Sequence, residues 1–191
     1  HAGTDQSVRP FLGKNVIVGI VDYGFQYTHP AFFNADGSAS RIERVWEQET
    51  SMGTRPAKFS YGKEYKSYAE LAKQKYDSQV DNIGHGTHVA GIIAAENNDL
   101  GGVGIAYNSK IMVLKAGNSS GYFNNSDIAE AVQYAYMNGA TVINMSFGGS
   151  FISIAVEEAL ENAYNSCILV AAAGNDSACN DLSCQVCDIV K

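Results

Sequence analysis

Four short apolar runs alternate with segments of helical pattern, and this alternation restricts the fold more than any other feature. The runs span residues 15–21, 111–115, 141–145 and 167–173. Because they are short and continuously apolar, they are typical of strands buried on both faces. Strands that alternate with helices need crossover connections, so we predict an α/β fold with a doubly wound, mostly parallel sheet. Ligands of such sheets bind beyond the carboxyl ends of the strands.

Two of the intervening segments carry apolar side chains at helical spacing. Ser126 is a candidate N-cap for a helix that ends at Gly139, because glycine accepts the positive φ common at helix ends. A second helix is predicted over residues 152–164. Residues 41–80 are rich in aromatic side chains but have no sustained period, so we expect a long surface excursion with a short helix at 67–75.

Composition narrows the class of protein. The 191 residues fit a single domain, and 46% apolar with 17% charged residues is typical of a soluble globular protein. No apolar run approaches the roughly 18 residues of a membrane-spanning helix, so we expect no membrane span. A formal net charge of −7 without clustered Lys or Arg argues against nucleic acid as a partner. The chain begins with His1, and we interpret it as a processed, secreted protein.

The four cysteines fall into two kinds of setting. Cys167 lies in an apolar run and is expected to be a buried thiol. Cys179, Cys184 and Cys187 crowd into a polar segment, where a disulfide or a zinc ion is conceivable. The Cys-x-x-Cys pair has no second Cys or His pair at zinc-finger spacing, which favours a disulfide and leaves its pairing open.

Three polar residues follow apolar runs or open a helix where a sheet of this type binds ligands. They are Asp22, His85 and Asn175. Taken singly, each also suits a turn or a helix cap next to glycine. Together they supply an aspartate to orient a histidine, a histidine to take a hydroxyl proton, and an amide to donate to an oxyanion. This combination predicts acyl-transfer chemistry.

Four segments, IVDYGFQYTHP, GHGTHVAG, INMSFGG and ILVAAAGN, resemble the successive signature segments of the subtilisin family, in the family's order. The resemblance implies that Asp22 is the orienting aspartate, His85 the general base and Asn175 the oxyanion donor. His88, one helical turn after His85, is expected to have a structural or supporting role. An alternative hypothesis is a dinucleotide-binding site at Gly101-Gly102-Val103-Gly104. Its support is weaker than that for the subtilisin family, because strand, glycine turn and helix are not in the required order there.

The resemblance also implies a peptide or protein substrate and the residues that contact it. The expected edge segment, which pairs with an extended peptide as an added strand, is Ser120, Gly121 and Tyr122. The expected walls of the specificity pocket are Ser146, Phe147, Gly148, Gly149, Ala173 and Gly174. No acidic residue stands at the expected base of this pocket, so we predict an apolar or broad preference.

Two departures from the family pattern concern an insertion and a metal. Asp22 and His85 lie 63 positions apart, wider than in compact members, which places an insertion at about residues 41–80. Residues 96–102 resemble the family's calcium loop, with candidate ligands near Asn98, Leu100 and Gly102. Calcium-binding members have an aspartate where this chain has Ala31, so the sequence leaves open whether a structural calcium ion binds here. The chemistry itself requires no cofactor.

The third departure concerns the nucleophile. No segment like Gly-Thr-Ser-Met-Ala follows Asn175, and neither Ser146 nor Ser177 follows a Gly-Thr pair at the start of a helix. We therefore predict that residues 1–191 are the N-terminal portion of a subtilisin-like catalytic domain in a secreted serine endopeptidase. Its serine would lie on a separate, cleaved C-terminal chain of the same precursor. The alternative is an inactive pseudoprotease or a regulatory peptide-binding scaffold.

Overall fold

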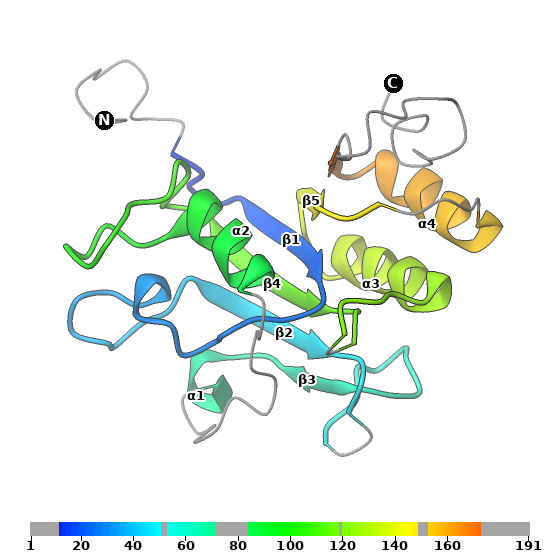
Figure 1. Cartoon of the computed structure of the whole chain (residues 1–191), viewed down its shortest axis with the longest axis horizontal. Helices are drawn as coiled ribbons and strands as arrows, with labels where there is room; N and C mark the ends of the chain where they lie inside the picture. The colour runs from blue at the N-terminus through cyan, green and yellow to red at the C-terminus, as the bar shows by residue number, and fades with distance from the viewer. Residues whose placement is uncertain (1–11, 51–52, 72–83, 119, 149–152, 173–191) are drawn as a thin grey trace.

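The computed structural model describes residues 12–50, 53–71, 84–118, 120–148 and 153–172. In chain order, the elements are β1 Ile17–Asp22, the 3-10 turn η2 Pro30–Phe32, β2 Ile42–Glu47, β3 Lys63–Tyr65, α1 Tyr68–Leu71, α2 His85–Ala94, β4 Lys110–Lys115, α3 Asn125–Met137, β5 Val142–Met145, α4 Ile154–Tyr164 and β6 Ile168–Ala171 (Figure 1).

The strands form one sheet in the order β3-β2-β4-β1-β5-β6. Every neighbouring pair is parallel except β2 and β3, which are antiparallel. All four strands predicted from the apolar runs are present, as β1, β4, β5 and β6. The predicted α/β fold with a mostly parallel sheet is therefore confirmed.

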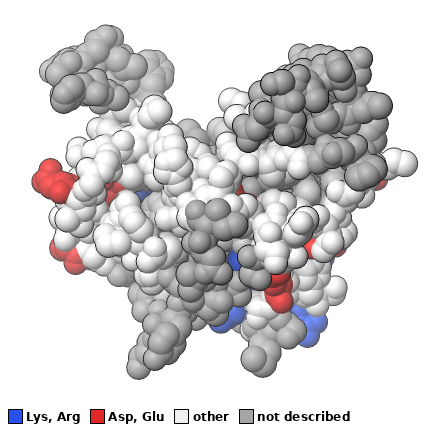
Figure 2. All heavy atoms as spheres, viewed as in Figure 1, with Lys and Arg blue, Asp and Glu red and all other residues white. Residues whose placement is uncertain are grey.

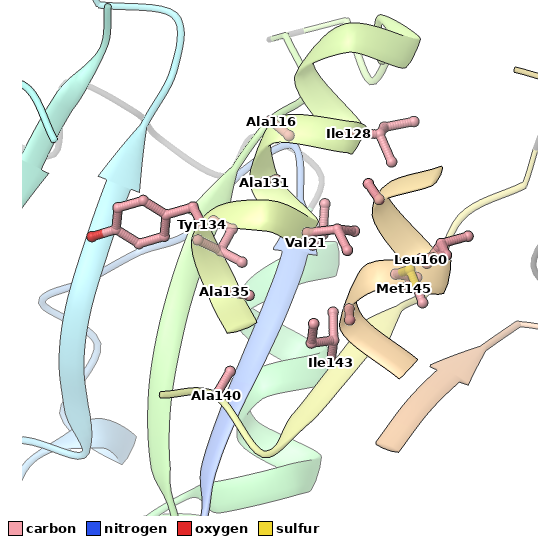
Figure 3. Close-up of a cluster of buried hydrophobic side chains, with 14 of the residues drawn as sticks. Val21, Ala116, Ile128, Ala131, Tyr134, Ala135, Ala140, Ile143, Met145 and Leu160 are labelled. Atoms are coloured by element: carbon pink, nitrogen blue, oxygen red, sulfur yellow. The ribbon is translucent and has the colours of Figure 1, made fainter. Parts of the chain in front are cut away.

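Side chains that alternate along the two central strands divide the core into two layers. Val18 and Ile20 of β1 pack in the cluster that includes α2, whereas Val21 packs in the cluster of α3 and α4. Figure 3 shows this second cluster, in which Ile143 and Met145 of β5 lie near Leu160 of α4. Helices thus cover both faces of the sheet, as a doubly wound fold requires.

The surface excursion expected at residues 41–80 is wrong where β2 and β3 form, because both strands belong to the sheet. Residues 42–47 form β2, which pairs with β4 inside the sheet, and Trp46 is fully buried. The ring of Trp46 lies 4.5 Å from that of Phe59, 5.7 Å from Tyr61 and 4.9 Å from Tyr134 of α3. Aromatic residues without a sequence period are thus gathered by tertiary contact. The short predicted helix is present as α1, and residues 72–75 lie outside the described residues.

The helix expected after Ser126 begins slightly earlier. Asn124 occupies the N-cap position of α3, so Ser126 lies within the first turn, and its expected capping role is wrong. The Asn124 amide instead donates to the carboxylate of Asp127 at 2.8 Å. The helix ends as predicted, with Asn138 at the C-cap and Gly139 at φ +88°. The helix predicted over residues 152–164 is α4, and residue 152 lies outside the described residues.

The thiol of Cys167 is buried and free, as expected, and donates to the carbonyl oxygen of Ala140 at 3.0 Å. Burial raises the pKa of this thiol. The cluster formed by Cys179, Cys184 and Cys187 lies outside the described residues, so its pairing stays open.

A buried carboxylate ties the antiparallel strand β3 to the rest of the sheet. Glu64 accepts hydrogen bonds from the Tyr134 hydroxyl at 2.5 Å and from Arg44 Nη1 at 2.9 Å. Lys66 Nζ lies 3.0 Å from its second carboxylate oxygen. Burial works to raise the pKa of Glu64, but hydrogen bonds from Tyr134, Lys66 and Arg44 outweigh it and hold that pKa below its ordinary value.

Glu64→Gln should lower the free energy of unfolding at pH 7 by about 1–3 kcal/mol, because it weakens these charge-assisted bonds. Since the pKa is lower in the folded state, the carboxylate stabilises the fold above the unfolded-state value of about 4.3, and this stabilisation is lost as pH falls further. Urea unfolding of wild type and variant should therefore converge at acidic pH. The exposed Glu161→Gln is the control, and equal stability of all three proteins at pH 7 would contradict the expectation.

Candidate active site

Asp22 is the last residue of β1 and lies at the carboxyl edge of the sheet, with only 1% of its surface exposed. Its backbone is held there because the N–H groups of Ala116 and Gly117 both donate to its carbonyl oxygen, at 2.9 and 3.3 Å. One carboxylate oxygen, Oδ1, accepts the N–H of Tyr23 at 2.8 Å. The other, Oδ2, lies 2.8 Å from Nδ1 of His85.

His85 is the first residue of α2, which begins here after Gly84 at φ +75°. With its proton on Nδ1, the imidazole donates to Asp22, and Nε2 becomes the acceptor. The His85 side chain is 37% exposed, so it borders solvent while its partner carboxylate is buried. His88 lies one turn further along α2 and is exposed. The pair Asp22–His85 is therefore brought together as the sequence predicted, whereas the roles of both residues stay a prediction.

Close packing of α2 on the segment after β1 sets the distance between these two residues. A Cβ atom at Gly86 would overlap with the carbonyl oxygen of Gly24 and lie 3.1 Å from the Asp22 side chain. The N–H of Gln26 also donates to Thr87 Oγ1 at 2.8 Å. The start of the helix thus rests directly on the chain that leaves β1.

The expected edge segment forms a loop after β4, at the same edge of the sheet. Asn118 closes this loop, because its side-chain oxygen accepts the N–H groups of Ser120 and Tyr122 at 2.9 and 3.0 Å. The N–H of Gly121 donates to the carbonyl oxygen of Asn118 at 2.9 Å. The side chain of Tyr122 is 74% exposed. Pairing of this loop with a substrate strand stays a prediction.

A row of aromatic rings connects three strand ends at this edge. The ring of Phe147, after β5, lies 4.6 Å from that of Phe123, which lies 6.0 Å from Tyr23. Tyr23 in turn stacks on His85, with ring centroids 5.7 Å apart and planes inclined by 19°. Phe147, expected in the wall of the specificity pocket, and His85, the expected general base, are therefore parts of one connected surface.

The remaining predicted site residues fall into two groups. Ser146 and Gly148 follow β5, and Ser146 Oγ accepts a hydrogen bond from Asn144 Nδ2 at 2.9 Å. The others lie outside the described residues, namely Gly149, Ala173, Gly174 and Asn175.

Sequence reasoning missed three residues of this region. Tyr23 and Phe123 belong to the aromatic row, and Lys115 ends β4 with its side chain 2% exposed. The Lys115 amine donates to Glu49 Oε2 at 2.6 Å and to the carbonyl oxygen of Gly117 at 3.1 Å. The sequence offered two signals for them. One was a lysine that ends an apolar run, and the other was a tyrosine directly after a candidate catalytic aspartate.

The candidate calcium loop is closed by the protein's own groups. The Asn98 amide nitrogen donates to the carbonyl oxygen of Pro30 at 3.1 Å, and its oxygen accepts the N–H of Leu100 at 3.0 Å. Arg41 pairs with Glu96 at the start of the loop at 2.5 Å. Within the described ranges, no group of three or more His, Cys, Asp or Glu side chains could hold a metal ion. Whether backbone carbonyls bind calcium here stays open.

Two further properties are the distribution of positive charge on the surface and the apolar length of the helices. On the face drawn in Figure 2, the visible Lys and Arg atoms lie in small separate groups. No helix among the described residues is both long enough and apolar enough to cross a membrane.

A family model for the subtilases matches residues 13–186 of the chain. The chain belongs to the subtilase family. Subtilisin DY of Bacillus licheniformis is 35% identical to this subtilase over 169 residues, which cover 88% of the chain and 50% of that protein. The thermophilic serine proteinase of Bacillus sp. (strain AK1) is 35% identical over 163 residues, which cover 84% of the chain and 33% of that protein.

Solved structures give the same family. The CspB protease of Clostridium perfringens aligns with a TM-score of 0.70 at 26% identity, covering 92% of this subtilase and 39% of that chain. Fervidolysin of Fervidobacterium pennivorans, a keratinolytic enzyme related to subtilisin, aligns with a TM-score of 0.64 at 29% identity. The alignment covers 93% of this subtilase and 24% of fervidolysin. This chain therefore spans half or less of the length of each of these relatives.

Gly86→Ala should lower the free energy of unfolding by about 1–3 kcal/mol, because the added methyl group forces α2 away from β1. Gly91→Ala is the matched control on the same helix. A Cβ atom there meets nothing within 4 Å, and alanine in a helix interior should raise stability by about 0.5–1 kcal/mol. Chemical denaturation measures both changes. Equal effects at the two positions would show that Gly86 does not lie close to the carbonyl oxygen of Gly24.

Proposed function

We propose that this chain supplies the general base and its orienting aspartate to a secreted subtilisin-like serine endopeptidase. The observation that carries the proposal is the 2.8 Å hydrogen bond between His85 Nδ1 and the buried Asp22 carboxylate. Family membership supports it, since the subtilase family model covers both residues. The pair lies at the carboxyl edge of the sheet, where ligands of doubly wound folds bind.

The geometry is suited to proton transfer during acyl transfer. Asp22 holds the imidazole in the tautomer with its proton on Nδ1, so that Nε2 can take the proton of a serine hydroxyl. The resulting imidazolium is stabilised by a carboxylate that is almost fully shielded from water, where charge pairs attract more strongly. His85 then returns the proton to the leaving amine of the cleaved peptide bond. In this proposal, the Asn175 side chain donates to the oxyanion.

The serine belongs, in this proposal, to a C-terminal portion of the domain that joins these residues as a separate, cleaved chain. The relatives are at least twice as long as the part that this chain matches in them. In addition, β6 is the last strand of the described sheet, with β5 as its one neighbour there. Ile168 and Val170 on this strand are 67% and 43% exposed, and burial of such apolar side chains would favour docking of further structure.

A peptide or protein substrate would lie along the aromatic row. We propose contacts with the loop of Ser120, Gly121 and Tyr122 on one side and with Ser146, Phe147 and Gly148 on the other. The nearby apolar rings favour apolar substrate side chains. Residues 1–191 would then form the N-terminal portion of the catalytic domain, with an insertion within residues 41–80 that leaves β2 and β3 in the sheet.

Substitution of the proposed base provides the first test. In the purified full-length protein, His85→Ala should abolish labelling by a fluorophosphonate, and Asp22→Asn should lower kcat on a peptide substrate by about 10⁴-fold, because asparagine favours the wrong tautomer. Ile92→Ala is the control, since this side chain on the same helix is 51% exposed and its loss should leave kcat within a few-fold of wild type. Labelling that survives His85→Ala would refute the proposed role.

Intact-mass analysis of the native protein provides the second test. We expect two polypeptides, with the fluorophosphonate on the one that does not contain His85. A single labelled polypeptide that contains both parts would refute the separate chain and leave the catalytic roles intact. Absence of any label, with the site free of inhibitor, would instead favour the pseudoprotease alternative.

A further inference from the structure

Tyr23 contacts both members of the Asp22–His85 pair. Its backbone N–H donates to Asp22 Oδ1 at 2.8 Å, while its ring stacks on the imidazole of His85 at a centroid distance of 5.7 Å and an angle of 19°. Asp22 Oδ2 holds His85 through a hydrogen bond at Nδ1. This hydrogen bond restrains the imidazole at one atom of its edge, and a ring stacked on its face restricts rotation of the plane further.

The ring of Tyr23 is itself held in place. A Cβ atom at Gly117 would overlap with Tyr23 Cβ and lie 2.9 Å from its Cα, so the backbone after β4 approaches this residue too closely for any side chain. Phe123 packs its ring at 69° to that of Tyr23, in an edge-to-face arrangement that aromatic pairs favour. Phe123 is supported in turn by Phe147. Tyr23 is therefore a firmly supported surface for the histidine.

This arrangement matters because His85 is 37% exposed at the first residue of a helix, so part of its ring borders solvent. A base works well only when its nitrogen points at the hydroxyl it must deprotonate, and misplacement by about 1 Å can cost on the order of 10²-fold in rate. The face of an aromatic ring also attracts positive charge, so the stack favours the imidazolium formed during the reaction.

We propose that Tyr23 is a positioning residue for catalysis, which fixes the plane of the His85 imidazole and supports its charged form through ring stacking. The inference rests on the proposed role of His85. It requires an aromatic ring at position 23 and does not require the tyrosine hydroxyl.

The test compares Tyr23→Phe with Tyr23→Leu in the full-length protein. Phenylalanine keeps the ring, whereas leucine keeps much of the apolar volume without it. Tyr23→Leu should lower kcat on the order of 10-fold to 100-fold with KM changed less, and Tyr23→Phe should restore kcat to near the wild-type value. Tyr164→Ala, which removes an exposed aromatic ring at the end of α4, is the control and should leave kcat unchanged.

Proton NMR of the His85 ring gives a readout that does not depend on turnover. The ring current of a stacked aromatic ring changes the chemical shifts of nearby protons, so the His85 ring signals should shift in Tyr23→Leu and stay in place in Tyr23→Phe. A purely structural role would lower stability without this pattern.

The outcomes separate the inference from the proposed function. If His85→Ala retains activity, the proposed function fails, whatever Tyr23 does. If His85→Ala is inactive but Tyr23→Leu matches Tyr23→Phe in kcat and in the His85 signals, the inference is overturned and the proposed function stands. A rise in KM with unchanged kcat in Tyr23→Leu would likewise overturn it, since Tyr23 would then only contact substrate.

Discussion

The contact between the start of α2 and the chain leaving β1 determines the geometry on which the rest of the site depends. Gly86 lies so close to the carbonyl oxygen of Gly24 that no side chain fits between them. Because α2 begins at His85, this approach places the imidazole within 2.8 Å of a carboxylate at the end of β1. The hydrogen bond between Asp22 and His85 is thus a consequence of backbone packing between a central strand and the helix on its face.

Parallel pairing brings the other parts of the candidate site to the same edge of the sheet. The carboxyl ends of β4 and β5 lie beside that of β1, so the segments that follow them meet at one edge. The loop at Ser120–Tyr122 is closed by Asn118, and the chain after β5 contributes Phe147. Aromatic contacts join these parts to His85, so the site is a continuous surface made by three neighbouring strands.

Much of this could be predicted from the sequence, because strands buried on both faces produce uninterrupted apolar runs. The four predicted strands were present, and the pairing of Asp22 with His85 followed from motif and topology together. The strand β2 was missed because Glu43, Arg44 and Glu47 interrupt its apolar pattern. Their charges are accommodated by partners distant in sequence, such as the Tyr27 hydroxyl, which donates to Glu47 at 2.8 Å. No local pattern reports such partners.

The sequence by itself determined the fold class, the family and the identity of the candidate base and aspartate, since these depend on local periodicity and on motifs. Only the tertiary structure decided that Trp46 is core and that Tyr23 stacks on His85. It also showed that the buried Lys115 braces the loop after β4 through Glu49 and Gly117. The physical reason is that most of these contacts join side chains far apart along the chain, such as Trp46 with Tyr134, Tyr23 with His85 and Lys115 with Glu49.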